Sequence, residues 1–414
     1  MTDFGTELTR LMKERNVSVR GFANETGYSK THISQLCLGQ RNPSPVVAED
    51  LDGALHAGGQ LAALAPKKPA PRASQERAGI GRSDFLILTG AIIALLDVIK
   101  GEIPARIAAI SAGQTRMDDE TADGLASVVL GYRQVYRSAA PSSLFDPVCG
   151  AIRLLIDLAP EAGQHRDKIV SLIGQAGSLA ATILMLDQGD FDAAKRYVAI
   201  ATRAARQSGD DELMGISLAV QAFHACYLGD APDGLAFAVE AQRVAGGHGV
   251  HPLSRGWINA VASEMYATTG DQEGFERALA AAQGFIQEPD PGRPWEGIGA
   301  FSSGKLTAYE GGGWLRLGKY EAAQMALHRA LGQLDKSCLK HRCTAHIDLA
   351  DAYARNGQAD EAARHGIAAL TIVADTRHAE SLRRVGLLDA DLRPHGTQAS
   401  RDLHSAYMEA RAAT

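Results

Sequence analysis

The sequence is poor in aromatic residues, and no stretch of it alternates apolar and polar residues as a half-buried strand does. Aromatic side chains make up 6% of the 414 residues, whereas alanine is abundant. Alanine has the highest intrinsic helix propensity, while strands favour aromatic and β-branched residues. These features predict an all-α protein, and the length allows two or three domains.

Long apolar runs are also missing. The most apolar segment, residues 85–99, has about 15 residues and is interrupted near its end by Asp97, whereas a membrane-spanning helix needs about 20. The first residues contain no basic region followed by an apolar one, so we expect no secretory signal. The sequence therefore indicates a cytoplasmic protein without a membrane partner, in which residues 85–99 form a buried helix.

The residue patterns of metal sites and of common enzymes are absent. The five cysteines form an odd number in a chain without an export signal, so reduced thiols are expected. Cys338, His341 and Cys343 lie close together, but a zinc site usually needs a second such cluster. The sequence has no G-x-S-x-G elbow, Walker A loop, H-E-x-x-H pair or dinucleotide fingerprint. We expect no metal, no cofactor, no catalytic residues and no enzymatic activity.

Charge is distributed unevenly along the chain. Residues 1–83 carry 11 Lys/Arg against 8 Asp/Glu, a net charge of +3, and the remaining residues carry a net charge of −9. A basic head on an acidic body is typical of a protein whose front end meets a polyanion. A charge of this size is also ordinary for a solvated surface.

The N-terminal segment contains capping and turn residues at the spacing of short helices. Ser18 and Ser29 are expected N-caps, and Gly27 is expected to end the helix that Ser18 begins. A helix, a glycine-containing turn and a second helix form the helix-turn-helix plan. The expected helices cover residues 4–15, 19–26 and 30–38, a segment from Pro45 through Leu55, and a short fifth helix.

The third of these helices has an apolar inner face. Ile33 and Leu36 are expected to be buried, and Ala23 is small enough for the preceding helix to cross closely. Lysine can donate to guanine, glutamine can pair with adenine, and threonine can contact a thymine methyl group. The outward residues of this helix therefore suit a DNA groove, although a solvated helical hairpin would show the same pattern.

A specific motif runs through this segment, namely Ser18-x-Arg20-x-Phe22-Ala23-x-x-Thr26-Gly27-Tyr28-Ser29-x-x-x-Ile33-Ser34-x-Leu36-x-x-Gly39-x-Arg41-x-Pro43-Ser44. It resembles the Cro/XRE-type repressor helix-turn-helix over essentially all of residues 1–65. The resemblance implies a sequence-specific transcription regulator that binds a double-stranded DNA operator. A single domain reads few base pairs, so a homodimer on paired half-sites is expected. The nine residues expected at DNA are Arg20, Ser29, Lys30, Thr31, His32, Ser34, Gln35, Arg41 and Asn42, of which Lys30, Thr31, His32 and Gln35 would contact bases.

Residues 66–83 are rich in proline and basic residues. Proline favours extended, partly stiff conformations, which is typical of a linker. Its positive charges either contact phosphates or keep the linker soluble.

The rest of the chain contains an internal repeat. Glycines that are expected at helix-to-helix turns recur at spacings of 40, 41, 48 and 39 residues, and an alanine follows each of them after twelve residues. Antiparallel helices pack closely only where small residues meet, and stacked pairs form a solenoid. The glycines are Gly189, Gly229, Gly270, Gly318 and Gly357, and the alanines are Ala201, Ala241, Ala282, Ala330 and Ala369.

Two segments, Leu317-Gly318-Lys319-Tyr320-Glu321-Ala322-Ala323 and Gly357-Gln358-Ala359-Asp360-Glu361-Ala362-Ala363, resemble tetratricopeptide (TPR) repeats. The usual period is 34 residues, so longer helices or loops are implied, including a proline-rich loop at residues 288–294. Residues 84–414 are thus predicted to form a TPR-like α-solenoid. Three consecutive glycines, residues 311–313, either permit close helix contact or mark a hinge.

The TPR resemblance implies a concave binding face at positions two, six and thirteen residues before each turn glycine. Such a face suits a peptide or another small effector, as in peptide-responsive regulators of the RRNPP type, which act in quorum sensing, and in helix-turn-helix/TPR regulators of actinobacteria. Two alternatives stay open, namely repeats that only dimerise or bind protein partners, and a scaffold whose helix-turn-helix no longer binds DNA. The expected effector-binding residues are Phe223, Tyr227, Trp257, Glu264, Lys305, Arg316, Asp351 and Arg355.

Overall fold

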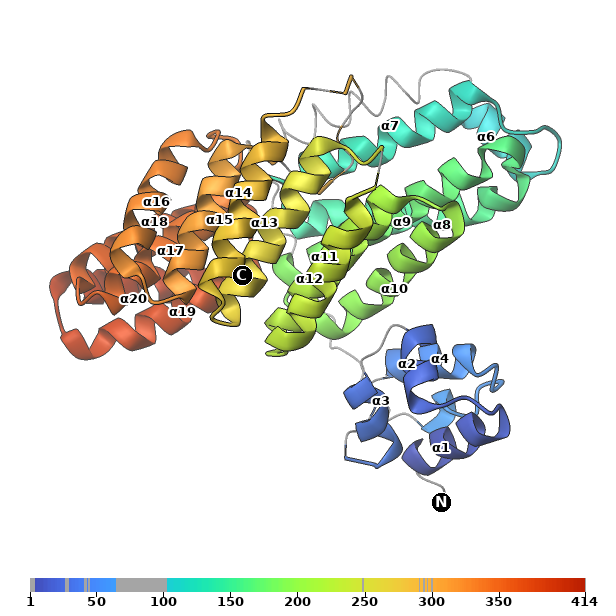
Figure 1. Ribbon diagram of the computed structural model, residues 1–414, viewed down its shortest axis with the longest axis horizontal. Coiled ribbons are helices and arrows are strands. Elements are labelled where there is room, and N and C mark those ends of the chain that lie inside the picture. The colour runs from blue at the N-terminus through green and yellow to red at the C-terminus, as the bar shows by residue number, and fades with distance from the viewer. Residues whose placement is uncertain are drawn as a thin grey trace. The chain divides into compact units, whose positions relative to one another are not determined.

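The computed structural model describes residues 4–26, 30–40, 43, 45–64, 103–247, 249–289, 291, 292, 295, 297, 298 and 301–413. The chain divides into two compact units, unit 1 (Met1–Gly79) and unit 2 (Ile80–Thr414). Every regular element in the described ranges is a helix (Figure 1), so the all-α prediction is confirmed. The expected linker and the apolar segment 85–99 lie outside the described residues.

Unit 1 forms the helices that its capping residues predict. The first helix ends one residue earlier than expected, and Asn16 follows it with a φ of +56°. The third also ends one residue early, and the fifth is a short 3-10 helix. The elements are α1 (Phe4–Glu14), α2 (Val19–Thr26), α3 (Lys30–Cys37), α4 (Pro45–Ala54) and η1 (Ala62–Leu64).

The core of unit 1 gathers one apolar stripe from each α-helix. Leu8, Phe22, Ile33 and Leu51 are fully buried in it. Gly5 permits the close contact of α1 with α3, because a Cβ there would stand 2.4 Å from the backbone oxygen of Leu36. Helices α1 and α2 pack directly on α3, whose inner face is buried in this core.

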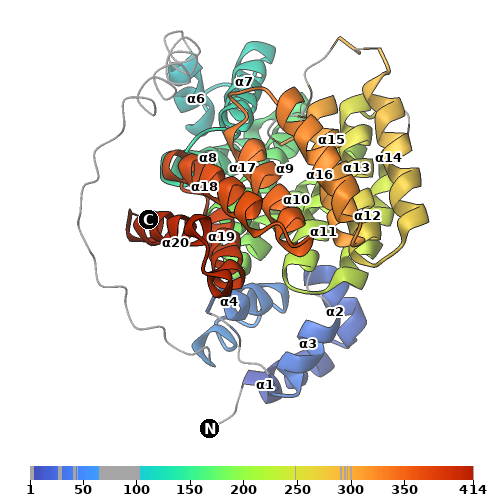
Figure 2. The same cartoon turned by 90° about the vertical axis from the view of Figure 1, so that its left-hand side faces the viewer.

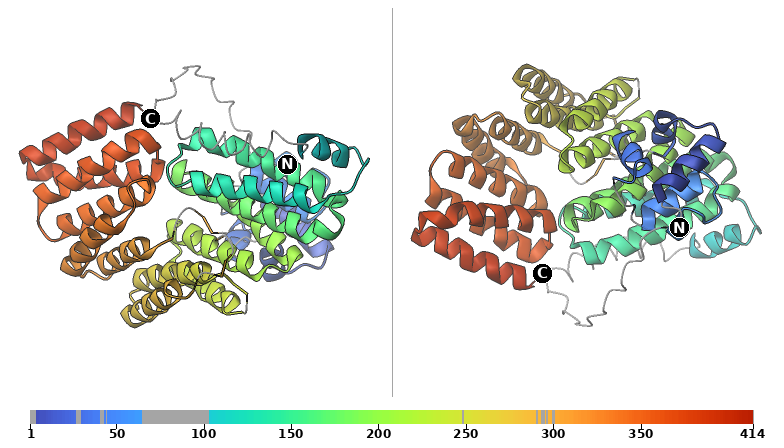
Figure 3. Two further views of the ribbon diagram at one scale, coloured as in Figure 1. Left: turned by 90° about the horizontal axis from the view of Figure 1, so that it is seen from above. Right: turned by 90° about the horizontal axis from the view of Figure 1, so that it is seen from below.

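Unit 2 is a succession of antiparallel helix pairs that follow a curved path in chain order (Figures 1 and 3). Figure 2 shows the later pairs, α13 to α18, packed against one another.

The elements before the first pair are α6 (Ile103–Ser111), α7 (Asp119–Val135), α8 (Pro141–Leu158), η2 (Ala159–Glu161) and η3 (Gly163–His165). The first three pairs are α9 (Arg166–Thr182), extended by the π-helical turn η4 (Ile183–Asp187), with α10 (Phe191–Ser208); α11 (Asp211–Tyr227) with α12 (Ala231–Ala245); and α13 (Pro252–Thr268) with α14 (Gln272–Ile286). The later elements are α15 (Ser303–Arg316) with α16 (Tyr320–Gln333), α17 (Leu339–Arg355) with α18 (Ala359–Thr376), and then α19 (Ala379–Leu392), η5 (Arg393–His395) and α20 (Gln398–Ala413).

Each of the five repeat glycines lies in the turn inside one pair. Their φ angles lie between +67° and +84°, a conformation that other residues rarely adopt. The alanine twelve residues later is buried in every pair, with an exposed fraction of 1% or less. The residue after the glycine is aspartate in the first three pairs, and its carboxylate caps the second helix by accepting a backbone N–H bond.

Two of the three glycines in α15 serve close packing. A Cβ on Gly311 would stand 2.4 Å from Leu327 Cγ in α16, and one on Gly313 would stand 2.1 Å from the Phe275 ring in α14. These contacts account for the two glycines without a hinge, because both flanking helices touch α15 where a side chain would otherwise stand.

One segment of unit 2, Gly163–Asp187, is long and apolar enough to cross a membrane by length and composition. In the structure 94% of its most apolar window is buried by the surrounding helices. Its apolar character is therefore explained by its place in the core.

We expect Gly313→Ala to lower the thermal unfolding midpoint of the full chain, measured by circular dichroism. The added methyl group collides with Phe275, and overpacking of this kind costs about 1–3 kcal/mol, more than the roughly 1 kcal/mol gained in helix propensity. Gly332→Ala is the matched control, because nothing lies within 4 Å of a Cβ at this helical position. It should leave the midpoint unchanged or raise it. A G313A midpoint equal to that of G332A would contradict the packing role.

Candidate nucleic-acid interface and solenoid cavity

Helix α3 is held by its inner face. The Ser18 hydroxyl accepts the backbone N–H of Gly21 at 3.0 Å and so begins α2. Phe22 and Ala23 then bury the inner side of α2, and Ile33 and Leu36 bury that of α3. Lys30, at the N-terminal end of α3, is exposed.

The structure locates four of the nine residues predicted at DNA by their side chains. Lys30 at the start of α3 and Arg20 on α2 are exposed, while Ser34 and Gln35 are half-buried beside the inner face of α3. The backbones of Thr31 and His32 belong to the first turn of α3. Three of the nine lie outside the described residues, namely Ser29, Arg41 and Asn42.

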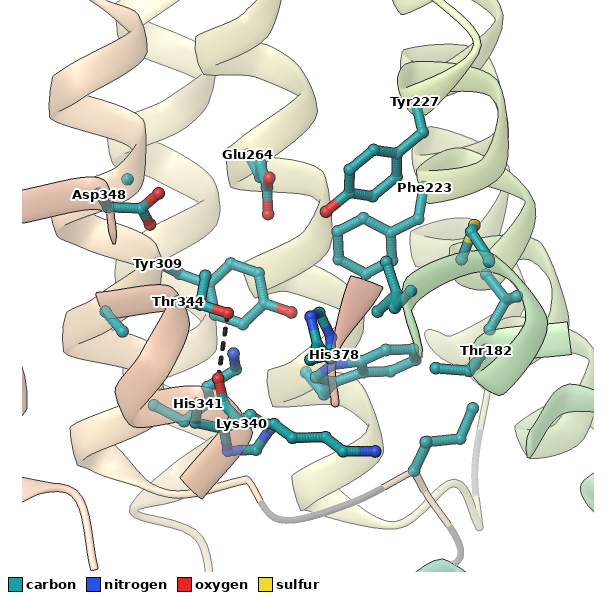
Figure 4. Close-up of a pocket in the computed structure, with 18 of the residues that line it drawn as sticks. Thr182, Phe223, Tyr227, Glu264, Tyr309, Lys340, His341, Thr344, Asp348 and His378 are labelled. Carbon is teal, nitrogen blue, oxygen red and sulfur yellow. Dashed lines mark hydrogen bonds between the residues drawn. The ribbon is translucent and has the colours of Figure 1, made fainter. Parts of the chain in front are cut away.

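Unit 2 encloses a cavity on the inner side of its first helices, which we call the inner cavity (Figure 4). Its volume is about 140 Å³, and an adjoining outer pocket has about 410 Å³. The two share Tyr227, Arg316, Asp348 and Arg384 in their walls.

All eight residues predicted at an effector lie in these walls. The inner cavity contains Phe223, Tyr227, Trp257, Glu264, Lys305 and Arg316, and the outer pocket contains Tyr227, Arg316, Asp351 and Arg355. They come from α11, α13, α15 and α17, the first helices of four successive pairs. Equal spacing from the turn glycine therefore places them on one inner surface.

Several further lining residues were missed by the sequence analysis. Val220, Tyr309 and Asp348 each lie nine residues before a turn glycine, one helical turn from the six-residue position, so the repeat register could have found them. Tyr136 after α7 and the α19 region contribute to the wall from outside the glycine repeat. These contributions depend on the folding of the whole unit, and no local pattern marks them.

Most charges on the inner surface are paired. The Arg316 guanidinium donates to Glu264 across 52 residues of sequence. Arg384 donates to Asp348 at 2.6 Å and to Asp351 at 2.7 Å, and these two carboxylates hold its pKa above the ordinary range. The pairs join α13 to α15 and α17 to α19, so they fix the spacing of the helices around the cavity.

A buried ion pair connects the beginning of the solenoid to its end. Lys340 at the start of α17 donates to Asp187 in η4 at 2.6 Å, and both side chains are almost fully buried. The Lys340 ammonium also lies 4.0 Å from the ring centroid of Tyr136. Burial raises the pKa of Asp187 and lowers the pKa of Lys340, against their mutual attraction. We call this contact the closing pair.

His378 lies beside the closing pair and caps α19. Its Nε2 is 3.5 Å from Asp187 Oδ1, while its Nδ1 accepts the backbone N–H of Ser381 at 3.1 Å and lies 2.8 Å from the Ser381 hydroxyl. Burial lowers the pKa of His378 to about 3, so the ring is neutral at neutral pH. Serine, histidine and aspartate are thus close together, but Ser381 is buried and does not line the cavity. Because Nδ1 accepts the backbone N–H of Ser381, His378 acts as the N-cap of α19.

Comparisons with known proteins identify the N-terminal part. Residues 3–65 match the helix-turn-helix domain family. Unit 1 is a helix-turn-helix domain. The match covers its α2–turn–α3 arrangement and ends at the last residue of the domain expected from the sequence. No curated protein matches the chain.

Among solved structures, the chain is similar to BtubC (BKLC) from P. vanneervenii, with 17% identity, a TM-score of 0.40, and coverage of 57% of this chain and 92% of that one. It is also similar to the Signal Transduction ATPase with Numerous Domains (STAND) protein with a tetratricopeptide repeat sensor from Pyrococcus horikoshii. That likeness has 13% identity and a TM-score of 0.37, and it covers 72% of this chain and about half, 53%, of that one. Both TM-scores lie below 0.5, so neither likeness bears on function.

We expect Lys340→Met to destabilise unit 2 strongly, because it leaves the Asp187 carboxylate buried without its cation. Removal of one partner of a buried pair costs about 3–5 kcal/mol. The double variant Asp187→Leu/Lys340→Met should recover much of this loss, since apolar replacement of both partners is often neutral or stabilising.

Urea unfolding followed by circular dichroism measures these effects. Lys336→Met is the control, because Lys336 lies three residues before α17 and is exposed. A K340M curve that coincides with the K336M curve would show that the closing pair contributes nothing to stability.

Proposed function

We propose that the chain is a sequence-specific transcription regulator of the Cro/XRE type that acts as a homodimer in the cytoplasm. The observation that carries the proposal is the presentation of α3. Ile33 and Leu36 hold its inner face in a helix-turn-helix domain, and Lys30 is exposed at the end that such domains direct into the major groove.

In this proposal Lys30, Thr31, His32 and Gln35 read base edges, and Arg20 contacts phosphate. Lysine and glutamine supply the donors and acceptors that distinguish base pairs in the major groove. The exposed Arg20 guanidinium on α2 suits a phosphate oxygen, because α2 crosses the backbone when α3 lies in the groove.

Unit 2 acts as the sensing half of the regulator, with TPR-like repeats that take a peptide or another small effector. The proposal is supported by the eight inner residues that come together in the walls of the inner cavity and the outer pocket. Four pairs contribute to one enclosed space, so an occupant contacts several pairs at once and changes their mutual angles. A change in solenoid curvature then alters the spacing of the two DNA-binding domains of a dimer.

The cavity acts in binding and not in catalysis. Neutral histidine, aromatic rings and paired charges make up most of its described wall, and the serine near His378 is not among its lining residues. This arrangement offers no exposed nucleophile next to a base.

We expect the full chain to enrich one duplex sequence, arranged as two related half-sites, from a random DNA pool. Lys30→Ala and Gln35→Ala should each weaken binding to that duplex about tenfold or more, since a good base contact contributes about 1–3 kcal/mol. Arg20→Ala should weaken binding to all DNA sequences alike. It should also reduce the slope of log affinity against log salt concentration by about 1, the value for one lost phosphate contact.

Electrophoretic shift assays over a salt series measure these effects. Lys13→Ala, an exposed lysine on α1 that is not assigned to DNA, is the matched control and should bind as the parent does. Light scattering on the free protein reports the dimer. A pool from which no sequence is enriched would refute the regulator and favour an interaction scaffold.

A further inference from the structure

The inner cavity has the size of one ring and walls that suit one. An apolar cavity of about 150 Å³ holds a benzene molecule, and the inner cavity has about 140 Å³. Phe223 and Trp257 contact each other in its wall, with ring centroids 6.5 Å apart and an interplanar angle of 46°, and Tyr309 and Tyr136 add two further aromatic rings. A ring is thus favoured over an extended peptide in this space, because pockets for larger ligands have about 300 Å³ or more.

Lys305 differs from the other cations of this wall. Arg316, Lys340 and Arg384 each hold a carboxylate within hydrogen-bond distance, whereas no carboxylate among the described residues forms an ion pair with the Lys305 ammonium. The ammonium instead lies over the face of Tyr309, with 5.0 Å from Nζ to the ring centroid. The Lys305 side chain is half-buried, and this burial lowers its pKa.

An unpaired, partly desolvated ammonium favours an anionic ligand group. The desolvation of the cation has already occurred in the folded protein, so an incoming carboxylate gains a charge-assisted hydrogen bond without that cost. A cationic ligand would be repelled by Lys305, and a neutral ligand would leave the ammonium unpaired.

His341 lies in the same wall as a neutral group. Its Nδ1 is buried and has no hydrogen-bond partner among the described residues. Burial, together with the nearby Lys305 charge, lowers the pKa of His341 well below its usual range, so the ring is neutral. Among the described lining residues, Lys305 is therefore the cation left for an anionic ligand group.

We propose that the inner cavity binds a small aromatic carboxylate, with its ring against the aromatic wall that Phe223 and Trp257 form and its carboxylate on Lys305. This inference rests on the proposed function, since it names the chemical class of the effector. Ring burial supplies affinity, and the single unpaired cation selects the anion.

Titration calorimetry on the full chain tests the inference with benzoate, phenylacetate and indole-3-acetate as probes, each against its neutral amide. At least one carboxylate should bind about tenfold or more tightly than its amide, because a hydrogen bond to a charged group contributes about a factor of ten or more. Lys305→Met should abolish this preference while the amide affinity stays within about twofold. Lys305→Arg should retain the preference, and Lys336→Met should behave as the parent.

Equal binding of carboxylate and amide, a preference that survives in K305M, or no binding of any carboxylate probe at millimolar concentration would overturn the inference. Circular dichroism of K305M checks its folding, and the neutral, polar Lys305→Gln tests the charge if K305M fails to fold. Binding to the selected duplex, measured on the same preparations, separates the two proposals. Duplex binding without carboxylate binding overturns the effector class alone, whereas carboxylate binding without any selected duplex overturns the regulator alone.

Discussion

Close contact between the two helices of each pair is the constraint on which unit 2 depends. Helices approach one another only where their side chains are small, and the alanine twelve residues after each turn glycine is buried in all five pairs. Gly311 and Gly313 extend the same rule to both sides of α15. Because the second helix of every pair is held on the same side, the first helices are left to form the inner surface. The cavity therefore depends on helix packing at positions that do not themselves line its wall.

This dependence explains how much of the cavity the sequence reveals. A residue at a given distance from a turn glycine takes the same orientation in each pair, so the repeat register alone suffices to group Phe223, Glu264 and Asp351 on one surface. The same register applied one helical turn earlier would have added Tyr309 and Asp348. Tyr136, His378 and Arg384 could not be found in this way, because they belong to parts of the unit without the glycine period. Their position at the cavity depends on how all the helix pairs of unit 2 are stacked.

Unit 1 was predictable for a different reason. Its helix ends are determined by local contacts, such as the Ser18 hydroxyl that accepts the Gly21 N–H. Contacts between residues close in the chain can be predicted from the sequence. The expected ends differ from the observed ones by a single residue at α1 and α3. The half-burial of Ser34 and Gln35 was not predictable, because a helical wheel of α3 alone places both residues outside its apolar face. A residue on the outer side of a helical wheel is not always free of its neighbours.

Solenoid proteins generally tolerate a change in repeat number, since each repeat touches only its neighbours. The closing pair restricts this freedom here. Asp187 and Lys340 are separated by 153 residues, and the intervening pairs bring them together. Insertion or loss of one pair would carry Lys340 and His378 away from Asp187 and leave a carboxylate buried alone. A change in the number of repeats between them therefore requires that both charged residues be replaced as well, whereas a substitution elsewhere on the inner face leaves the pair intact.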